Sequence, residues 1–105
     1  MGERTTNIQN GDLGETLARL TQTIRQRRTA TPDASYTARL LTHNEDELLK
    51  KIGEEATELV LAVKDHDHDH IRYEAGDLLY HLLVLLERTG ISPEELAGEL
   101  DARMK

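Results

Sequence analysis

The chain lacks cysteine, tryptophan and phenylalanine altogether, and only 2 of its 105 residues are proline. The absence of cysteine excludes disulfides, thiolate nucleophiles and cysteine-ligated zinc. Residues 1–14 contain no apolar run, so we expect neither a signal peptide nor a membrane anchor, and a cytoplasmic protein that binds no membrane. A length of 105 residues allows one domain, and so small a chain buries little enough surface that self-association is a fair expectation.

The net charge of -7 is divided unevenly along the chain. Residues 1–43 carry six basic and four acidic groups, whereas residues 44–105 carry seven basic and sixteen acidic groups. An acidic chain repels the phosphate backbone, so we expect no nucleic-acid partner. The acidic part could serve a cation and the basic part a phosphate, or both could be solvated helix faces.

Helical spacing of the apolar residues, with no long alternating pattern, argues against a sheet. The sequence therefore predicts an all-α fold, a small helical bundle with two long antiparallel helices that is completed by dimerisation. We expect residues 1–11 to be a flexible N-terminal extension and residues 12–105 to form the all-α domain. Capping residues and apolar spacing predict helices over the following ranges: 13–28, 36–41, 45–64, 71–88 and 93 onward, with residues 65–70 connecting the two long ones.

Glutamates border the apolar stripe that we expect on the helix over residues 45–64. At 100° per residue this core stripe has the following members: Leu48, Leu49, Ile52, Ala56, Leu59, Val60 and Val63. Glu55 and Glu58 lie on its border together with Lys51, and Glu54 lies further toward solvent. The pattern thus indicates Glu55-x-x-Glu58 as an acidic pair, with Glu54 as its outer neighbour.

The helix over residues 71–88 is apolar around nearly its whole circumference, which is typical of a helix buried on all sides. In a chain this short, such a helix indicates that a second subunit packs on it. One narrow strip is the exception, and it holds Glu74, Asp77 and His81. Because acidic side chains are rarely buried without a partner, this strip is either a surface or a site.

The two acidic pairs, Glu55 with Glu58 and Glu74 with Asp77, should lie at matching heights, because the helices are antiparallel and joined by a short connection. Four carboxylates at one point would repel by about 20 kcal/mol at an effective dielectric constant of 20, which exceeds a domain's usual stability of about 5–15 kcal/mol. Oxygen ligands of this kind favour Mg²⁺, with Mn²⁺ as the alternative ion. The opposing interpretation is that the pairs face water separately and never meet.

The motif Glu55-x-x-Glu58, followed after fifteen residues by Glu74-x-x-Asp77, resembles the signature of the all-α MazG-like nucleoside triphosphate pyrophosphatases. Within that superfamily the chain resembles the phosphoribosyl-ATP pyrophosphatases of histidine biosynthesis, over about residues 13–100. Three longer strings carry this narrower resemblance: residues 32–40, 50–58 and 76–86. Gly76 is the one departure, since alanine is expected there.

The resemblance implies hydrolysis of phosphoribosyl-ATP between its α- and β-phosphates, which gives phosphoribosyl-AMP and pyrophosphate. By motif position it implies four Mg²⁺ ligands, namely Glu55, Glu58, Glu74 and Asp77. It also implies a general base for the attacking water, for which the candidates are Glu54, Glu55 and Glu58.

Four further residues are candidates for substrate binding, each with a structural alternative. By the same resemblance, Tyr36 and Arg39 lie near the nucleotide, with Arg39 as a phosphate contact; the alternative is an ordinary capped helical turn. Lys51 shares the face of the acids and could reach a phosphate oxygen or form a salt bridge with Glu55. His81 could orient a ligand, or it could be a satisfied core histidine.

The run Asp65–His70 alternates aspartate with histidine and could bind Zn²⁺ or Ni²⁺, but an exposed interhelical loop explains it more simply. Two alternatives to the histidine-pathway enzyme stay open. One is a house-cleaning pyrophosphatase of the same fold that acts on dUTP or damaged dNTPs. The other is a non-catalytic helical dimerisation module.

Overall fold

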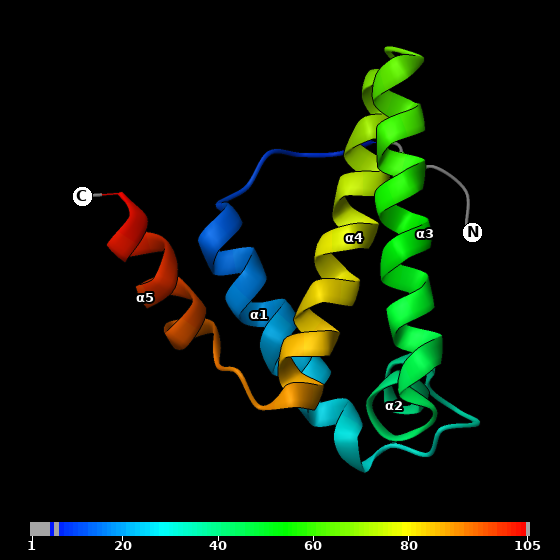
Figure 1. The fold of residues 1–105 in the computed structure, drawn as a ribbon, viewed down its shortest axis with the longest axis vertical. Helices are drawn as coiled ribbons and strands as arrows, with labels where there is room; N and C mark the ends of the chain where they lie inside the picture. The colour runs from blue at the N-terminus through cyan, green and yellow to red at the C-terminus, as the bar shows by residue number, and fades with distance from the viewer. Residues whose placement is uncertain (1–4, 6, 105) are drawn as a thin grey trace.

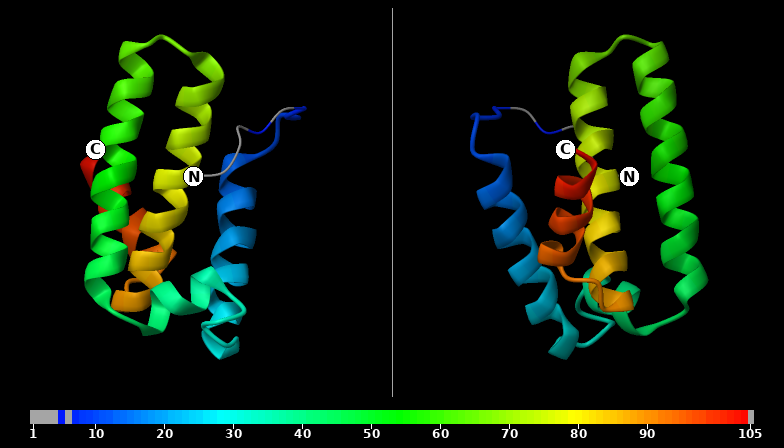
Figure 2. Two further views of the ribbon diagram at one scale, coloured as in Figure 1. Left: turned by 90° about the vertical axis from the view of Figure 1, so that its right-hand side faces the viewer. Right: turned by 60° about the vertical axis from the view of Figure 1, so that its left-hand side comes forward.

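A computed structural model of the chain describes residue 5 and residues 7–104. The elements, in chain order, are α1 (Leu13–Gln26), the 3₁₀-helix η1 (Arg27–Thr29), α2 (Tyr36–Thr42), α3 (Glu45–Lys64), α4 (His68–Thr89) and α5 (Pro93–Arg103). Figure 1 shows α3 and α4 as the tall antiparallel pair, with α2 at its lower end. Figure 2 shows α3, α4 and α1 side by side, with α5 behind this row in the left view. The predicted all-α fold is confirmed.

Short polar residues begin three of the helices, as the sequence predicts. The side chains of Ser35, Asn44 and Ser92 accept hydrogen bonds from backbone N–H groups in the first turns of α2, α3 and α5. Gly90 ends α4 with a φ of 82°, in the left-handed region that only glycine adopts without strain. Local capping chemistry therefore sets these boundaries.

The connection between the two long helices is shorter than predicted. We expected residues 65–70 to be a loop, but α4 begins at His68, with the side chain of Asp67 accepting a hydrogen bond from His70 N at 3.1 Å. The prediction was wrong because Asp67 is the N-cap of α4 and not part of a longer loop. As a result His70 lies in the first turn of α4, one turn before Glu74.

A small core joins the four helices α1 to α4. Its members are Ile24, Leu40, Leu41, Leu48 and Val84. Arg88 Nη1 donates a hydrogen bond of 2.8 Å to the carbonyl of Leu40, which ties α2 to α4. Glu87 accepts hydrogen bonds from Arg25 Nε at 3.1 Å and from Arg28 Nε at 2.6 Å, which ties α1 and η1 to α4. These contacts therefore fix α1, η1 and α2 to the end of the α3–α4 hairpin that lies opposite its turn.

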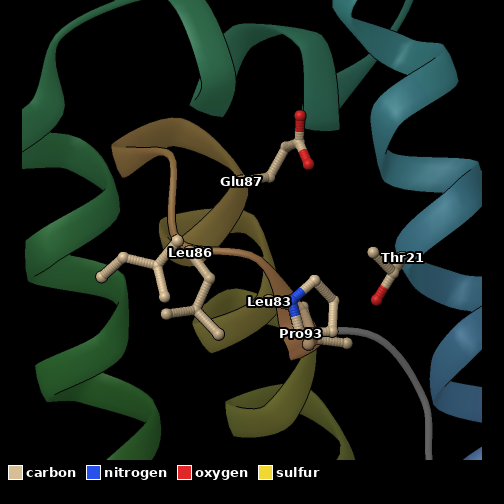
Figure 3. A pocket seen from close by; sticks show the side chains of 6 residues that line it. Thr21, Leu83, Leu86, Glu87 and Pro93 are labelled. Atoms are coloured by element: carbon tan, nitrogen blue, oxygen red, sulfur yellow. The ribbon is translucent and has the colours of Figure 1, made fainter. Parts of the chain in front are cut away.

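The start of α5 folds back toward α1 across α4 and encloses a small cavity of about 10 Å³ (Figure 3). Its lining includes Thr21, Leu83, Leu86, Glu87 and Pro93. Among the residues that the structure describes, no helix is both long and apolar enough to span a membrane.

Helix α3 is turned relative to the predicted stripe. Leu49, Val60 and Val63 were expected in the core but are 45%, 61% and 46% exposed, whereas Glu55, expected at the border, is fully buried. The face toward α4 is instead centred on residues seven apart, Leu48, Glu55 and Ala62, all fully buried. The apolar pattern of a helix shows which residues are apolar, but it does not distinguish those that pack within the chain from those that stay exposed on its surface.

The predicted N-terminal extension precedes the first helix. Residues 7–11 are exposed, and the carbonyl of Thr5 accepts a hydrogen bond of 3.4 Å from Arg72 Nη2 on α4. Residues 1–4 and 6 lie outside the described residues, so the flexibility of residues 1–11 stays a prediction.

Candidate metal site

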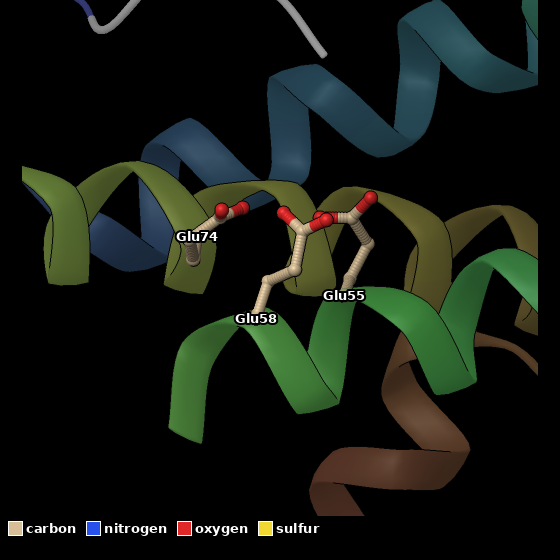
Figure 4. A group of neighbouring side chains, drawn as sticks. All are labelled: Glu55, Glu58 and Glu74. Atoms are coloured by element: carbon tan, nitrogen blue, oxygen red, sulfur yellow. The ribbon is translucent and has the colours of Figure 1, made fainter. Parts of the chain in front are cut away.

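Three carboxylates meet between α3 and α4. Glu55 and Glu58 project from α3 and Glu74 from α4, and one ligand atom from each lies within 4.8 Å of the others (Figure 4). Facing positions of an antiparallel hairpin bring them to the same height, as the residue count from the turn predicts. The alternative, in which the acidic pairs face water separately, does not hold for these three residues.

Asp77, the fourth predicted ligand, borders this cluster without belonging to it. Its carboxylate is 25% exposed and lies 3.8 Å from His81 Nδ1 through Oδ1. The proximity and the charge of Asp77 both act on the Glu55 carboxyl, which places the two side chains near each other. The structure thus puts Asp77 beside the site at the level of Glu55.

Burial and neighbouring carboxyl groups raise the pKa of Glu55 and of Glu58. The pKa of Glu55 is raised to about 7, chiefly by burial and then by the neighbouring carboxylate of Asp77. The pKa of Glu58 is also raised, first by the close approach of the Glu74 carboxyl and then by burial and the charge of Glu74. At neutral pH the metal-free site therefore resists full ionisation.

The cluster fits a divalent cation. Among the described residues, both oxygens of Glu55 and Oε1 of Glu74 are buried without a hydrogen-bond partner, and Glu55 Oε1 has only the ion-pair contact of 3.5 Å with Lys51 Nζ. Buried carboxylate oxygens are costly unless they are paired or bind a metal. Because all the available donors are carboxylate oxygens, their chemistry suits Mg²⁺ or Mn²⁺ rather than a soft metal.

Lys51 lies beside these acids. Its Nζ lies 3.5 Å from Glu55 Oε1 and 3.8 Å from Glu54 Oε1. Burial alone would lower the pKa of Lys51, but the neighbouring Tyr36 and Glu55 raise it overall. The salt bridge considered from the sequence is therefore formed, and the ammonium also stands where it could meet an anion bound at the cluster.

His81 is buried and has a partner on each ring nitrogen. Nδ1 lies 2.8 Å from the carbonyl of Asp77 and therefore donates to it, and Nε2 then accepts a hydrogen bond of 3.0 Å from the hydroxyl of Tyr36. The rings of His81 and Tyr80 also meet edge to face, with centroids 4.9 Å apart. His81 is thus a buried histidine with both ring nitrogens hydrogen-bonded, and it connects Asp77 to Tyr36. A core position and a role in orienting a ligand are therefore compatible for this residue.

Arg39 packs against the same group of residues. Its guanidinium lies 5.2 Å from the centre of the Tyr36 ring, and its Nη2 forms an ion pair of 2.8 Å with Glu47. Its Nε is buried and has no hydrogen-bond partner among the described residues. Glu47, which the sequence indicated only as part of a helix cap, therefore pairs with one side of Arg39 and leaves a donor on the other.

Glu54 lies outside the cluster. Its side chain is 46% exposed and contacts Lys51 at the distance given above. It lines an open surface groove of about 600 Å³ together with Lys50, Gly53, Thr57, Glu58 and Leu61. Of the three general-base candidates, Glu55 and Glu58 are thus brought to the cluster and Glu54 is not.

Sequence reasoning missed His70. Its Nε2 lies 3.0 Å from Glu74 Oε2, four residues further along α4. A spacing of four residues brings two side chains together only within a helix, and the sequence predicted a loop at His70. Recognition of Asp67 as the N-cap would have placed His70 in α4 and so revealed its contact with Glu74.

Comparison with known proteins decides the family. A family model described as phosphoribosyl-ATP pyrophosphohydrolase matches residues 17–104 of this chain. The chain belongs to this family. The phosphoribosyl-ATP pyrophosphatase of Nitrosomonas eutropha is 53% identical over 87 residues, which cover 83% of this chain and 74% of that protein. The phosphoribosyl-ATP pyrophosphatase of Methylibium petroleiphilum is 48% identical over 89 residues, or 85% of this chain and 74% of that protein.

A longer relative contains the same domain. The histidine biosynthesis bifunctional protein of Thermus thermophilus is 45% identical over 89 residues, which are 85% of this chain but 42% of that protein. The family and the enzyme class predicted from the motifs, a hydrolase that acts on a phosphoric anhydride, are therefore confirmed. Among the described residues, the phosphoribosyl-ATP pyrophosphohydrolase fold places its acidic motif residues in and beside one buried cluster.

Proposed function

We propose that this chain hydrolyses phosphoribosyl-ATP to phosphoribosyl-AMP and pyrophosphate in a Mg²⁺-dependent reaction, with Mn²⁺ as a substitute ion. The observation that carries the proposal is the cluster of Glu55, Glu58 and Glu74 in a member of this family, in which Glu55 and Glu74 have buried carboxylate oxygens without hydrogen-bond partners among the described residues. Such a cluster has no structural advantage over apolar packing unless it binds a cation.

Glu55, Glu58, Glu74 and Asp77 would hold the metal. When bound, Mg²⁺ would screen the charge of the polyphosphate and polarise the attacked phosphorus. The protein's own part is then to align a water molecule and to accept its proton. Glu58 combines partial exposure with a raised pKa, which makes it a better proton acceptor than an ordinary carboxylate, and Glu54 and Glu55 stay as alternatives.

The remaining candidates would bind the substrate. Lys51, beside Glu55, would contact a phosphate oxygen, and Arg39 would contact a second one with the donors that Glu47 leaves free. The hydroxyl of Tyr36 is fixed by His81, so its ring is held at one place beside Arg39. These side chains would orient the nucleotide relative to the carboxylates.

We also propose that the chain forms a homodimer. We place its activity in the cytoplasm because its relatives are biosynthetic enzymes. Val60 and Val63 follow Glu55 by five and eight residues, and two leucines follow Glu74 by the same intervals. In an antiparallel hairpin these positions lie on the same side. The exposed residues of this apolar face are Val60 (61%), Val63 (46%), Leu79 (38%) and Leu82 (37%). A second copy of the chain would cover them.

An assay with phosphoribosyl-ATP, with and without Mg²⁺, tests the activity. We expect pyrophosphate release that needs the metal and stops when EDTA is added. Parallel reactions with dUTP and the dNTPs separate the candidate enzymes: turnover of dNTPs without turnover of phosphoribosyl-ATP would refute the histidine-pathway assignment. Absence of pyrophosphate release from every substrate would instead favour the non-catalytic dimerisation module.

A further inference from the structure

We propose that His70 is a positioning residue for the metal site, which holds the carboxylate of Glu74 so that one of its oxygens is fixed and the other is presented to the cation. This inference rests on the proposed metal site. It concerns a residue from the aspartate–histidine run, outside the acidic motif that carries the family resemblance.

The position of His70 is set by the start of α4. Its backbone N–H donates to the side chain of Asp67, the N-cap, at 3.1 Å. Residues four apart on a helix lie one above the other, so the imidazole reaches Glu74 in the next turn. The side chain of His70 is 26% exposed, whereas that of Glu74 is 1% exposed. The contact therefore lies at the edge of the site, between solvent and the buried cluster.

The two oxygens of Glu74 have different environments. Oε2 lies 3.0 Å from His70 Nε2, which donates its hydrogen to the carboxylate, whereas Oε1 is buried and has no hydrogen-bond partner within the described part of the chain. The carboxylate as a whole points toward that of Glu58 (Figure 4). The imidazole thus fixes one oxygen and leaves the other for an ion among Glu55, Glu58 and Glu74.

Removal of His70 would free the Glu74 carboxylate to turn away from the like charge of Glu58. Groups that hydrogen-bond to metal ligands fix the orientation of those ligands, and their loss typically weakens metal binding about 10–100-fold. His68 offers a matched control two residues earlier in the same run. Its side chain is 87% exposed and contacts Asp69 rather than the cluster.

Titration of the full-length protein with Mn²⁺, followed by electron paramagnetic resonance, tests the proposal. We expect His70→Ala to weaken Mn²⁺ binding about 10-fold or more. His70→Gln should restore most of the affinity, because its amide nitrogen can donate from nearly the same place as Nε2. His68→Ala should bind Mn²⁺ as the wild-type protein does, and the thermal unfolding of all variants without metal reports whether they fold.

Three results would overturn the inference, each in a different way. Equal Mn²⁺ affinity of folded His70→Ala and wild type would show that the imidazole positions nothing. Failure of folded His70→Gln to recover affinity would count against the hydrogen bond. A ¹⁴N coupling to bound Mn²⁺ that disappears in His70→Gln would make His70 a ligand instead. If the wild-type protein itself bound no Mn²⁺, the proposed metal site would fail first, and this outcome is distinct from the other three.

Discussion

Glu55 occupies a position that a helical bundle ordinarily gives to an apolar residue. Leu48 and Ala62 lie one heptad before and after it on α3, and all three side chains are fully buried. Burial, together with Asp77, raises the pKa of Glu55 to about 7. The ionised residue therefore destabilises the metal-free protein, and a bound cation would remove that destabilisation.

A pH-dependent loss of stability follows for the metal-free protein. Between about pH 4.5 and pH 7 the folded state keeps a proton on Glu55 that the unfolded chain has already released, so this residue's contribution lowers the stability as the pH rises through this window. The loss of folding free energy is at most about 3–4 kcal/mol, at about 1.4 kcal/mol per pKa unit. Urea denaturation in EDTA at pH 5 and pH 8 measures it, and Glu55→Gln should lose most of the dependence.

Glu54→Gln provides the control, because Glu54 is the neighbouring residue but is exposed on the outer side of α3. Its stability should follow the wild-type pH profile. A profile for Glu55→Gln that parallels those of the wild type and Glu54→Gln would mean that Glu55 does not titrate in this range.

Loss of either acidic motif should abolish activity without unfolding the protein. Glu58→Gln and Asp77→Asn each remove one charge but keep the shape of the side chain, so we expect phosphoribosyl-ATP hydrolysis to fall by about 100-fold or more. Far-UV circular dichroism should stay unchanged. Glu94→Gln, at the exposed start of α5, should keep full activity. Wild-type activity in either site variant would contradict the proposed site.

The sequence predicted which acids converge, but not how deeply they are buried. Spacing and residue count brought Glu55, Glu58 and Glu74 to one height, because those quantities depend only on helix geometry. The burial of Glu55 depends on the rotation of α3 against α4, which the apolar pattern did not determine. The contact of His70 with Glu74 was missed for a local reason, the unrecognised cap at Asp67.

At the level of helices, Glu87 fastens α1 and η1 to α4. Its partial burial alone would raise its pKa, but hydrogen bonds and charges from Arg28 and Arg25 lower it overall. Its side chain is 15% exposed, so these ion pairs are partly shielded from water. Glu87→Gln should reduce the free energy of unfolding by about 1–2 kcal/mol, because it weakens hydrogen bonds to charged partners.

Chemical denaturation at pH 7 measures this effect. The control is Glu99→Gln, which breaks the exposed ion pair with Arg103 within α5. Exposed pairs of this kind contribute about 0.3–0.5 kcal/mol on a helix. Equal effects of the two substitutions would indicate that Glu87 contributes no more than a surface pair.

Helix ends were easier to predict than helix faces. Ser35, Asn44 and Ser92 begin their helices and Gly90 ends α4 through hydrogen bonds and backbone conformations that lie within a few residues. The face that a helix turns inward is decided by contacts far apart in the sequence. For α3 the apolar pattern therefore predicted the length correctly and the rotation wrongly.

At the scale of the whole molecule, the apolar face of the hairpin is the strongest indication of a dimer. Val60→Glu places a charge in the middle of this face, and we expect it to shift the protein toward monomer by at least about 10-fold in the dissociation constant. Analytical ultracentrifugation over a range of concentrations measures the change.

Leu61→Glu is the matched control for this prediction. Leu61 is the next residue of α3 and is 57% exposed, but it lines the groove beside Glu58 rather than the proposed dimer face. Its dissociation constant should match that of the wild type. A wild-type protein that stays monomeric at all concentrations would refute the dimer outright.

The turn at residues 65–67 constrains which insertions the α3–α4 hairpin can accept without separating the two acidic pairs. Both acidic pairs are counted from this turn, so one added helical turn on each side, about seven residues in all, would leave the pairs facing each other. One added residue would instead rotate one pair by about 100° away from the other. Related hairpins that keep this site should therefore differ in length by steps of about seven residues, with the distance from site to turn free to vary.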